Sequence, residues 1–429
     1  PLFSFLGSNP NPHFNGTWSG GPTGATTGNF FNAQLAGPGT YTLIYTVPAV
    51  GTCPARNATV ILTVHTLPNS GTPVPLRFCE TDDFSPYTNF NLFNQLTGAD
   101  PGGSWTENSG TTELSNPGDS FINIQNIATT FGPGTYTFTY TVNASHPICP
   151  TATSNVAITI EPVADLNGAT LVVAPNLCFN EINTTPLIGT ITQGVNPIPN
   201  GTYNVTYVLT GSNSGTQTVS ITFSGGVGSF TINPAFITNV GTTTVEVTEI
   251  QNPATILNCT RAIANLTDTF EVFENPDATD TQINVADFCL NNSGQIVFND
   301  INAPTAELSN GIYNITFDIT GPNGTFTNQT TTVNINNGNG IATIISSLTP
   351  IDGNYSITIT NIQNNATGCA TTTNLTTTFE VFPIPNAQTI TVAIPNVCEG
   401  NDVIVNLSGA INLPNGFYDL TYTISGAIN

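Results

Sequence analysis

Residues 37–47 read GPGTYTLIYTV and residues 132–142 read GPGTYTFTYTV. In both copies Gly-Pro-Gly supplies a turn, and the residues after it alternate between threonine and an apolar or aromatic residue. This alternation is the period of a half-buried strand. A tyrosine that follows such a turn is typical of a corner in a β-sandwich, where its hydroxyl bonds to nearby backbone. We therefore expect Tyr41 and Tyr136 to begin a late strand in two similar domains. A glycine-rich phosphate loop would need a following helix and a lysine, and neither is present.

The charge balance removes several classes of function. The chain has 429 residues, a net charge of −23, three arginines (Arg56, Arg77 and Arg261) and no lysine. An acidic surface of this kind repels phosphate, so we expect no nucleic-acid partner and no docking on anionic lipid. No apolar run approaches the roughly 18 residues of a membrane span, so we expect no membrane insertion by this segment.

Strand-like stretches fill the rest of the sequence. Examples are NVAITIEPV (155–163), TYNVTYVLTG (202–211) and IYNITFDITG (312–321), each bounded by Gly, Pro or Asn-Gly signals. We find no convincing amphipathic helix pattern. The sequence therefore predicts an all-β protein.

The eight cysteines divide the chain into repeats. A leading cysteine occurs at Cys79, Cys178, Cys289 and Cys398, and a trailing cysteine, which precedes a long closing strand, occurs at Cys53, Cys149, Cys259 and Cys369. We number the predicted units repeat 1 (1–67, lacking its beginning), repeat 2 (68–163), repeat 3 (164–274), repeat 4 (275–384) and repeat 5 (385–429, lacking its end). Units of about 100 residues built from short strands predict a tandem array of immunoglobulin-like β-sandwiches.

Two disulfide schemes fit this spacing. The first pairs the cysteines within each repeat, as Cys79–Cys149, Cys178–Cys259 and Cys289–Cys369, with Cys53 and Cys398 paired outside the fragment. The second pairs them across a join, as in Cys149–Cys178. We expect the first scheme, because the leading and trailing cysteines should lie at the same pole of a sandwich, whereas the second scheme must span a closing strand of roughly 33 Å. Disulfides also imply an oxidising, extracellular location.

Candidates for chemistry are few. His13, His65 and His146 share no spacing across the repeats, and no nucleophile motif or recurring carboxylate pair is present, so we expect no enzyme activity. The join that contains Glu274, Asp277, Asp280 and Asp287 is acidic enough for calcium, but the next join, residues 383–397, has no carboxylate. We therefore expect no cofactor and keep calcium as the alternative.

The two tryptophans are the remaining candidates for a binding site. Trp18 lies in NGTWSGG and Trp105 in GGSWTEN. Each could provide a platform on which a sugar stacks, or could pack in the core as the central tryptophan of a sandwich does, and the core is the expectation we favour.

The repeats also resemble a known family. NVCEGND (396–402), the GPGTYTxxYTV corner and a trailing cysteine before an alternating strand are similar to the Ig-like or PKD-like repeats of very large Bacteroidetes surface proteins, which include gliding-motility adhesins. The resemblance implies export by the type 9 secretion system, display as a filament on the bacterial cell surface, and adhesion to a substratum or polysaccharide. It also implies contact with outer-membrane motility or secretion machinery.

These expectations combine into one functional hypothesis. The chain would be a structural stalk segment of a long bacterial surface adhesin, used in attachment or gliding motility. The alternative is that single repeats of a secreted extracellular protein bind a glycan, or bind a protein through the edge of a strand.

Overall fold

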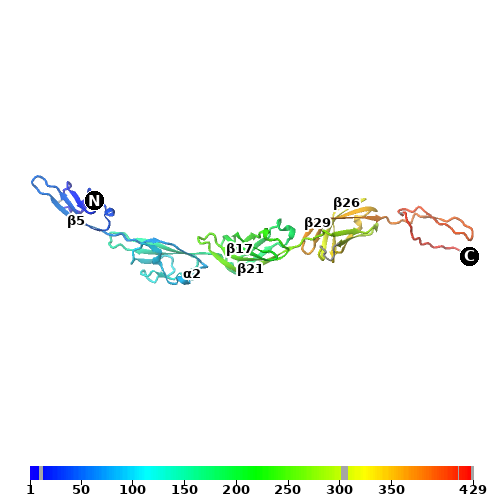
Figure 1. Ribbon diagram of the computed structural model, residues 1–429, viewed down its shortest axis with the longest axis horizontal. Helices are drawn as coiled ribbons and strands as arrows, with labels where there is room; N and C mark the ends of the chain where they lie inside the picture. The colour runs from blue at the N-terminus through cyan, green and yellow to red at the C-terminus, as the bar shows by residue number, and fades with distance from the viewer. Residues whose placement is uncertain (9–12, 301–307, 414, 427–429) are drawn as a thin grey trace.

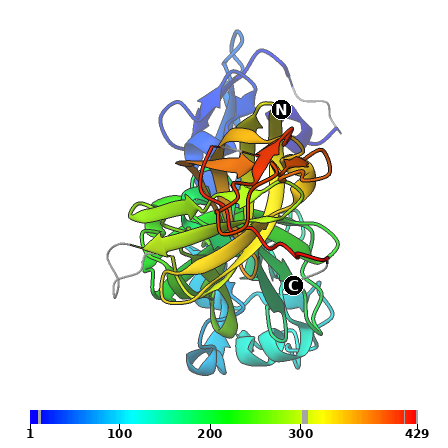
Figure 2. The ribbon, with the colours of Figure 1, turned by 90° about the vertical axis from the view of Figure 1, so that its right-hand side faces the viewer.

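The computed structural model describes residues 1–8, 13–300, 308–413 and 415–426. The chain forms a row of β-bodies with its termini at opposite ends (Figure 1). A view along the row shows the bodies behind one another (Figure 2). Every sheet in the described residues pairs strands from a single predicted repeat. The fold is therefore a tandem array of sandwiches, and the predicted all-β, immunoglobulin-like class is confirmed.

Repeat 3 shows the sandwich most completely. One sheet has the order β15 (Leu177–Cys178), β21 (Thr260–Phe273), β20 (Gly241–Gln251), β17 (Gly201–Gly211) and β18 (Gly215–Phe223). The other has β14 (Thr170–Ala174), β16 (Ile188–Thr192) and β19 (Val227–Thr231). Alternate residues of both sheets, such as Val205, Phe223 and Ile191, are buried between them in one core. The alternation seen in the sequence is thus the alternation between core and solvent.

Repeat 4 repeats this plan. Its larger sheet has the order β23 (Phe288–Cys289), β29 (Ala370–Phe382), β28 (Gly353–Asn364), β25 (Gly311–Gly321) and β26 (Gly324–Ile335). Its smaller sheet contains β22 (Thr281–Val285), β24 (Gly294–Asp300) and β27 (Gly340–Ile344). The core between them includes Phe298, Phe317 and Ile357.

Repeat 2 has one main sheet, ordered β10 (Ser104–Glu107), β12 (Gly134–Val142), β13 (Ala152–Glu161) and β7 (Leu76–Cys79). Two small pairs lie beside it: β6 (Thr72–Pro73) with β9 (Leu96–Thr97), and β8 (Phe90–Asn91) with β11 (Phe121–Ile122). The helix α2 (Ile124–Phe131) buries Ile124 and Ile127 in the same core. The absence of any amphipathic helix was therefore a wrong expectation. At eight residues, α2 is too short to show a repeating pattern, and it begins at an Asn123 cap and ends at Gly132, where φ is 73°.

The two terminal repeats contain less structure. Repeat 1 has β1 (Thr17–Gly20), β4 (Gly39–Val47) and β5 (Arg56–Val64), the pair β2 (Thr26–Thr27) and β3 (Phe30–Phe31), and the one-turn helix α1 (Ala33–Ala36). In repeat 5 the described residues form one pair, β30 (Thr391–Ala393) and β31 (Asn406–Ser408). Short 3-10 helices occupy Leu2–Phe5, Ser85–Tyr87, Leu92–Gln95, Phe179–Glu181, Pro234–Phe236 and Ser346–Leu348.

The corner tyrosines behave as predicted. The Tyr41 hydroxyl donates to the carbonyl oxygens of Ala36, at 2.6 Å, and Gly37, at 3.0 Å. The Tyr136 hydroxyl donates to the Gly132 carbonyl at 2.8 Å. The same bond to the residue four positions earlier recurs at Tyr203, Tyr313 and Tyr355. The repeated stretch that opens the analysis is therefore a structural corner.

We predict that Tyr136→Phe lowers the free energy of unfolding of repeat 2 by about 1 kcal/mol, because the Gly132 carbonyl loses its partner while the ring keeps its packing. Denaturant unfolding of the full chain followed by fluorescence of Trp105 measures the change. Tyr87→Phe is the matched control, since it removes a hydroxyl that is not part of the corner. An equal loss in both variants would contradict the role of the corner bond.

Candidate functional site: the disulfide-bridged joins

The leading cysteines of repeats 2, 3 and 4 lie at the C-terminal pole of their repeats. The short strands β7, β15 and β23 run parallel to the closing strands β13, β21 and β29. This register places Cys79 opposite Glu161, Cys178 opposite Phe273 and Cys289 opposite Phe382. Because each closing strand ends where its repeat meets the next one, the leading cysteine lies at that join.

Each trailing cysteine lies at the other pole. Cys259 directly precedes β21, and Cys369 directly precedes β29. A closing strand begins at the N-terminal pole of its repeat, next to the preceding repeat. The two cysteines of one repeat are therefore separated by the length of the closing strand, and the expectation that they share a pole was wrong.

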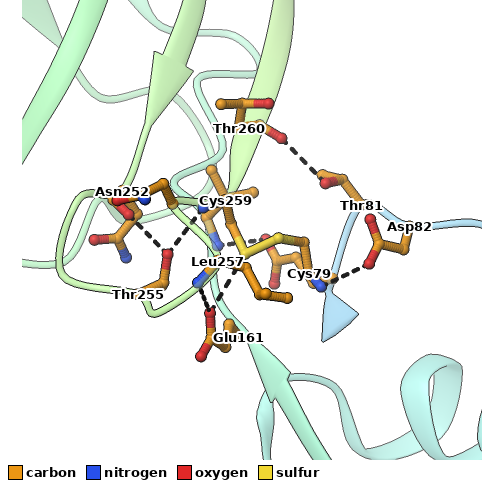
Figure 3. The surroundings of a disulfide bond; sticks show 12 residues. Cys79, Thr81, Asp82, Glu161, Asn252, Thr255, Leu257, Cys259 and Thr260 are labelled. Atoms are coloured by element: carbon orange, nitrogen blue, oxygen red, sulfur yellow. Dashed lines mark hydrogen bonds between the residues drawn. A yellow bond between two sulfur atoms is a disulfide. The ribbon is translucent and has the colours of Figure 1, made fainter. Parts of the chain in front are cut away.

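The disulfides consequently connect neighbouring repeats. Cys79 of repeat 2 is bonded to Cys259 of repeat 3, with Cα atoms 5.4 Å apart (Figure 3). Cys178 of repeat 3 is bonded to Cys369 of repeat 4, with Cα atoms 5.5 Å apart.

The intra-domain scheme, Cys79–Cys149, Cys178–Cys259 and Cys289–Cys369, is corrected by this pairing, and so is the alternative Cys149–Cys178. We call the two bridged contacts the 2–3 join and the 3–4 join.

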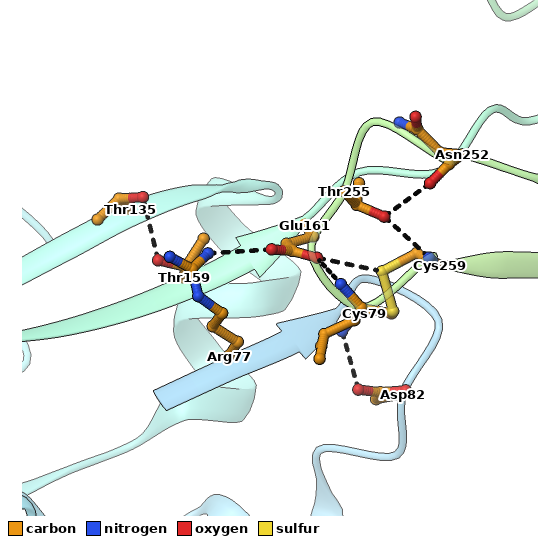
Figure 4. Close-up of polar contacts among 10 residues, drawn as sticks. Arg77, Cys79, Asp82, Thr135, Thr159, Glu161, Asn252, Thr255 and Cys259 are labelled. Atoms are coloured by element: carbon orange, nitrogen blue, oxygen red, sulfur yellow. Dashed lines mark hydrogen bonds and ion pairs between the residues drawn. A yellow bond between two sulfur atoms is a disulfide. The ribbon is translucent and has the colours of Figure 1, made fainter. Parts of the chain in front are cut away.

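Glu161 organises the 2–3 join (Figure 4). Its side chain is 6% exposed, and Oε1 accepts from Arg77 Nη1 at 3.0 Å. Its other oxygen, Oε2, accepts from the backbone N–H of Leu257 at 2.9 Å and lies 3.8 Å from the Cys259 sulfur. One carboxylate thus joins a side chain of repeat 2 to the loop of repeat 3 that carries the disulfide. A buried charge of this kind is tolerated because it is paired and hydrogen-bonded.

Three further contacts cross the 2–3 join. Arg261 Nη2 donates to Glu80 Oε1 at 2.6 Å. The Thr81 hydroxyl donates to the Thr260 carbonyl at 3.0 Å, and the Asn252 amide donates to the Pro162 carbonyl at 3.1 Å. Cys79, Val163 and Cys259 form a small buried cluster between these polar contacts. Two of the three arginines of this strongly acidic chain therefore form ion pairs at one join.

Asp165 adds to the negative charge near Arg261. Its pKa is held below the ordinary value by the backbone N–H of Asn167, with smaller contributions from the Asn196 amide and the positive charge of Arg261, while burial acts in the opposite direction. The carboxylate is therefore ionised at neutral pH and favours the position of Arg261 at the join.

The 3–4 join uses amides in place of ions. The Asn180 N–H donates to Asn275 Oδ1 at 2.9 Å, and the Asn180 and Asn275 amides both donate to the Ala370 carbonyl, at 3.4 and 3.1 Å. Thr81 and Asn180 each stand two positions after a leading cysteine, and their acceptors each follow a trailing cysteine. The contact beside the disulfide is therefore the same in both joins, although the residue types differ.

Four cysteines have no disulfide in this structure: Cys53, Cys149, Cys289 and Cys398. Cys289 has the register of the bonded Cys79 and Cys178. Cys149 follows a loop that reaches repeat 1, where the His146 ring stacks on His65 with ring centroids 4.3 Å apart. The trailing loop of repeat 2 thus contacts the preceding repeat, as the trailing loops of repeats 3 and 4 do.

The tryptophans differ in burial. Trp105 is 3% exposed and packs in the core of repeat 2 against Tyr140, with ring centroids 4.9 Å apart. The core position favoured from the sequence is therefore confirmed for Trp105, and the alternative of a glycan contact there is corrected, because a buried ring presents no face to a sugar. Trp18 is partly exposed, packs against the small core of repeat 1, and has its ring centroid 5.0 Å from that of Tyr45. For this residue the favoured core position and the alternative of a glycan contact both stay predictions.

Two of the acidic residues after repeat 3 accept hydrogen bonds from backbone within repeat 4. Asp277 Oδ1 accepts from the Thr279 N–H at 3.0 Å, and Asp287 Oδ1 accepts from the Glu380 N–H at 2.7 Å. Within the residues that the structure describes, no group of three or more His, Cys, Asp or Glu side chains is placed to hold a metal ion. The expectation of no cofactor, with calcium as the alternative, stays a prediction. No helix among the same residues is long and apolar enough to cross a membrane.

Sequence reasoning located the cysteines but missed Arg77, Glu161 and Arg261. One signal was available: all three arginines, Arg56, Arg77 and Arg261, stand within three residues of a cysteine. Trailing and next leading cysteines are also evenly spaced, at 149 and 178, 259 and 289, and 369 and 398. That regularity indicates a conserved geometry along the array, but it does not identify which sulfurs meet.

The chain is similar to several solved structures but has no match by sequence. No protein-family model and no curated protein matches the chain. Among solved structures, it is similar to a Ca²⁺-stabilised adhesin with which an Antarctic bacterium binds ice, at 12% identity over 86% of this chain and 89% of that one, with a TM-score of 0.31. The Escherichia coli adhesin FdeC matches at 13% identity over 80% and 92%, with a TM-score of 0.33. Invasin, a bacterial integrin-binding protein, matches at 15% identity over 88% and 62%, with a TM-score of 0.28.

We predict that Glu161→Gln speeds the reduction of Cys79–Cys259 by dithiothreitol about fivefold. The carboxylate beside the sulfur repels an attacking thiolate by roughly 1 kcal/mol, and the amide does not. Timed alkylation followed by mass spectrometry measures the rate. The Cys178–Cys369 bridge of the same molecule is the internal control, and an equal acceleration of both bridges would contradict a local electrostatic effect.

Proposed function

We propose that the chain is a structural stalk segment of a long bacterial cell-surface adhesin filament. The observation that carries this proposal is the pair of disulfides, each of which bonds one repeat to the next. A binding module has no need for a covalent tie to its neighbour, whereas a stalk must keep its units in line. The polar contacts of the 2–3 and 3–4 joins support the same role, since they further limit how neighbouring repeats move.

We extend the pairing rule to the other four cysteines. If every leading cysteine bonds to the trailing cysteine of the next repeat, Cys289 and Cys398 pair with trailing cysteines of later repeats. By the same rule Cys53 and Cys149 pair with leading cysteines of earlier repeats. The equivalent register of Cys289 and the contact between His146 and His65 support this extension. All eight cysteines would then serve one continuous array in an oxidising, extracellular location.

The finer assignment is part of the same proposal. The resemblance of the repeats to Bacteroidetes surface proteins supports a role in attachment or gliding motility and export by the type 9 system. It also supports contact with a substratum, a polysaccharide or outer-membrane machinery. In this role the chain transmits force and performs no catalysis.

Binding of the full chain to a panel of polysaccharides tests the stalk against the alternative of glycan-binding modules. A stalk segment shows no saturable binding at low or moderate salt. Saturable binding that Trp18→Ala abolishes, and that the core control Trp105→Phe retains, would overturn the stalk proposal in favour of a glycan-binding module.

Small-angle X-ray scattering tests the mechanical part. We predict that the variant with Cys79→Ser and Cys178→Ser, which loses both bridges, has a broader distance distribution than the oxidised chain, because its joins bend more freely. Far-UV circular dichroism shows whether the sandwiches remain folded. Identical scattering profiles from two folded samples would contradict a role for the disulfides in holding the row straight.

A further inference from the structure

The two disulfides interlock along the chain. Their cysteines occur in the order Cys79, Cys178, Cys259 and Cys369, so each bridge encloses one cysteine of the other. The first bridge forms a covalent node at the 2–3 join, and the second forms one at the 3–4 join. More than one backbone segment therefore connects these two nodes.

Three backbone segments connect the two nodes in parallel. One runs from Cys79 through the body of repeat 2 and then along repeat 3 to Cys178. The second runs from Cys178 back through the body of repeat 3 to Cys259. The third runs from Cys259 along β21 and then through the body of repeat 4 to Cys369. Each segment begins at one node and ends at the other, because the disulfides merge Cys79 with Cys259 and Cys178 with Cys369.

Two of these segments cross repeat 3 by a short path. β21 covers Thr260–Phe273 as one extended strand with almost no slack, and residues 163–178 cross the same repeat through a turn at Asn167 and Gly168 followed by β14 and β15. An extended segment of about 15 residues spans roughly 50 Å, close to its limit. Further lengthening of either segment requires residues to be pulled out of repeat 2 or out of repeat 4.

We propose that the interlocked disulfides give the chain a further function as a load-sharing device. Tension along the array is divided among three backbone segments at repeat 3, and this repeat can lengthen only if repeats 2 and 4 unravel at the same time. Three folded cores then resist a load that would otherwise unfold one core at a time. This property concerns how the chain carries force, and it holds whatever the array binds or wherever it is displayed.

The connectivity also sets an upper limit on extension. The shortest of the three segments, Cys178 to Cys259, has about 80 residues, so the nodes can separate by at most roughly 290 Å. Without the bridges, repeats 2 to 4 could each unravel by roughly 300 Å, or about 900 Å together.

Single-molecule force spectroscopy of the full chain, held by folded protein handles at its two ends, tests the proposal. All samples carry serine at Cys53, Cys149, Cys289 and Cys398, which prevents exchange of disulfides. The samples are the oxidised chain with both bridges, the Cys79→Ser/Cys259→Ser variant, the Cys178→Ser/Cys369→Ser variant, and the variant with all four substitutions. Repeats 1 and 5 contribute the same signals in every sample and serve as the internal control.

The connectivity predicts that the four samples differ in how many of repeats 2 to 4 unfold singly. Each such unfolding step lengthens the chain by roughly 300 Å. The variant with neither bridge shows three steps. A variant with one bridge shows one step, because the loop that the remaining disulfide closes encloses the bodies of the other two repeats. When Cys79–Cys259 is absent, repeat 2 unfolds singly. When Cys178–Cys369 is absent, repeat 4 unfolds singly. The chain with both bridges shows no single-repeat step, and any lengthening occurs in one concerted event.

Three steps of full length in the chain with both bridges would overturn the proposal, and so would equal step numbers in all four samples. Circular dichroism and thermal unfolding of each sample show whether loss of a step reflects loss of the fold. The variant with neither bridge provides a second check, since its three steps show that all three sandwiches fold without their disulfides. Polysaccharide binding has a separate readout, so failure of the stalk proposal and failure of load sharing are distinguishable.

Discussion

The parallel pairing of a short leading strand with the closing strand determines the rest of the structure. Two residues of β15 lie beside the end of β21, and this small contact carries Cys178 to the pole of repeat 3 that meets repeat 4. If the leading strand instead began at the opposite pole, both cysteines of one repeat would meet and each sandwich would be closed on itself. Joins, disulfide connectivity and response to force all depend on this one register.

The joins show how a chain with little charge maintains specific contacts between domains. At the 2–3 join, the buried carboxylate of Glu161 accepts from Arg77 and from the loop of repeat 3, and a hydrogen bond to a buried charged group is stronger than one at the surface. At the 3–4 join, the Asn180 and Asn275 amides act on one carbonyl. The disulfide is common to both joins, so it is the shared constraint, and the polar residues around it vary without loss of the geometry.

Much of this fold follows from local patterns in the sequence. Alternation of threonine with apolar residues predicted the strands, and GPGTY predicted the corner tyrosines, because both depend on neighbouring residues. Helix α2 was missed because eight residues give no period, and the core position of Trp105 was favoured but not determined. The disulfide pairing depends on whether β7 runs parallel or antiparallel to β13. That choice is set by packing across about 80 residues of intervening chain, and no local spacing encodes it.

The central claim is that disulfides connect neighbouring repeats, and one digestion tests it most directly. Trypsin cuts after arginine, and cleavage after Arg77 and Arg261 yields fragments 78–261 and 262–429. The oxidised chain is alkylated to block free thiols, denatured, digested and run on a non-reducing gel. This account predicts that the two fragments stay linked through Cys178–Cys369 and separate only after reduction. If they separate without reductant, every disulfide lies within a fragment, as intra-repeat pairing requires, and the account is contradicted.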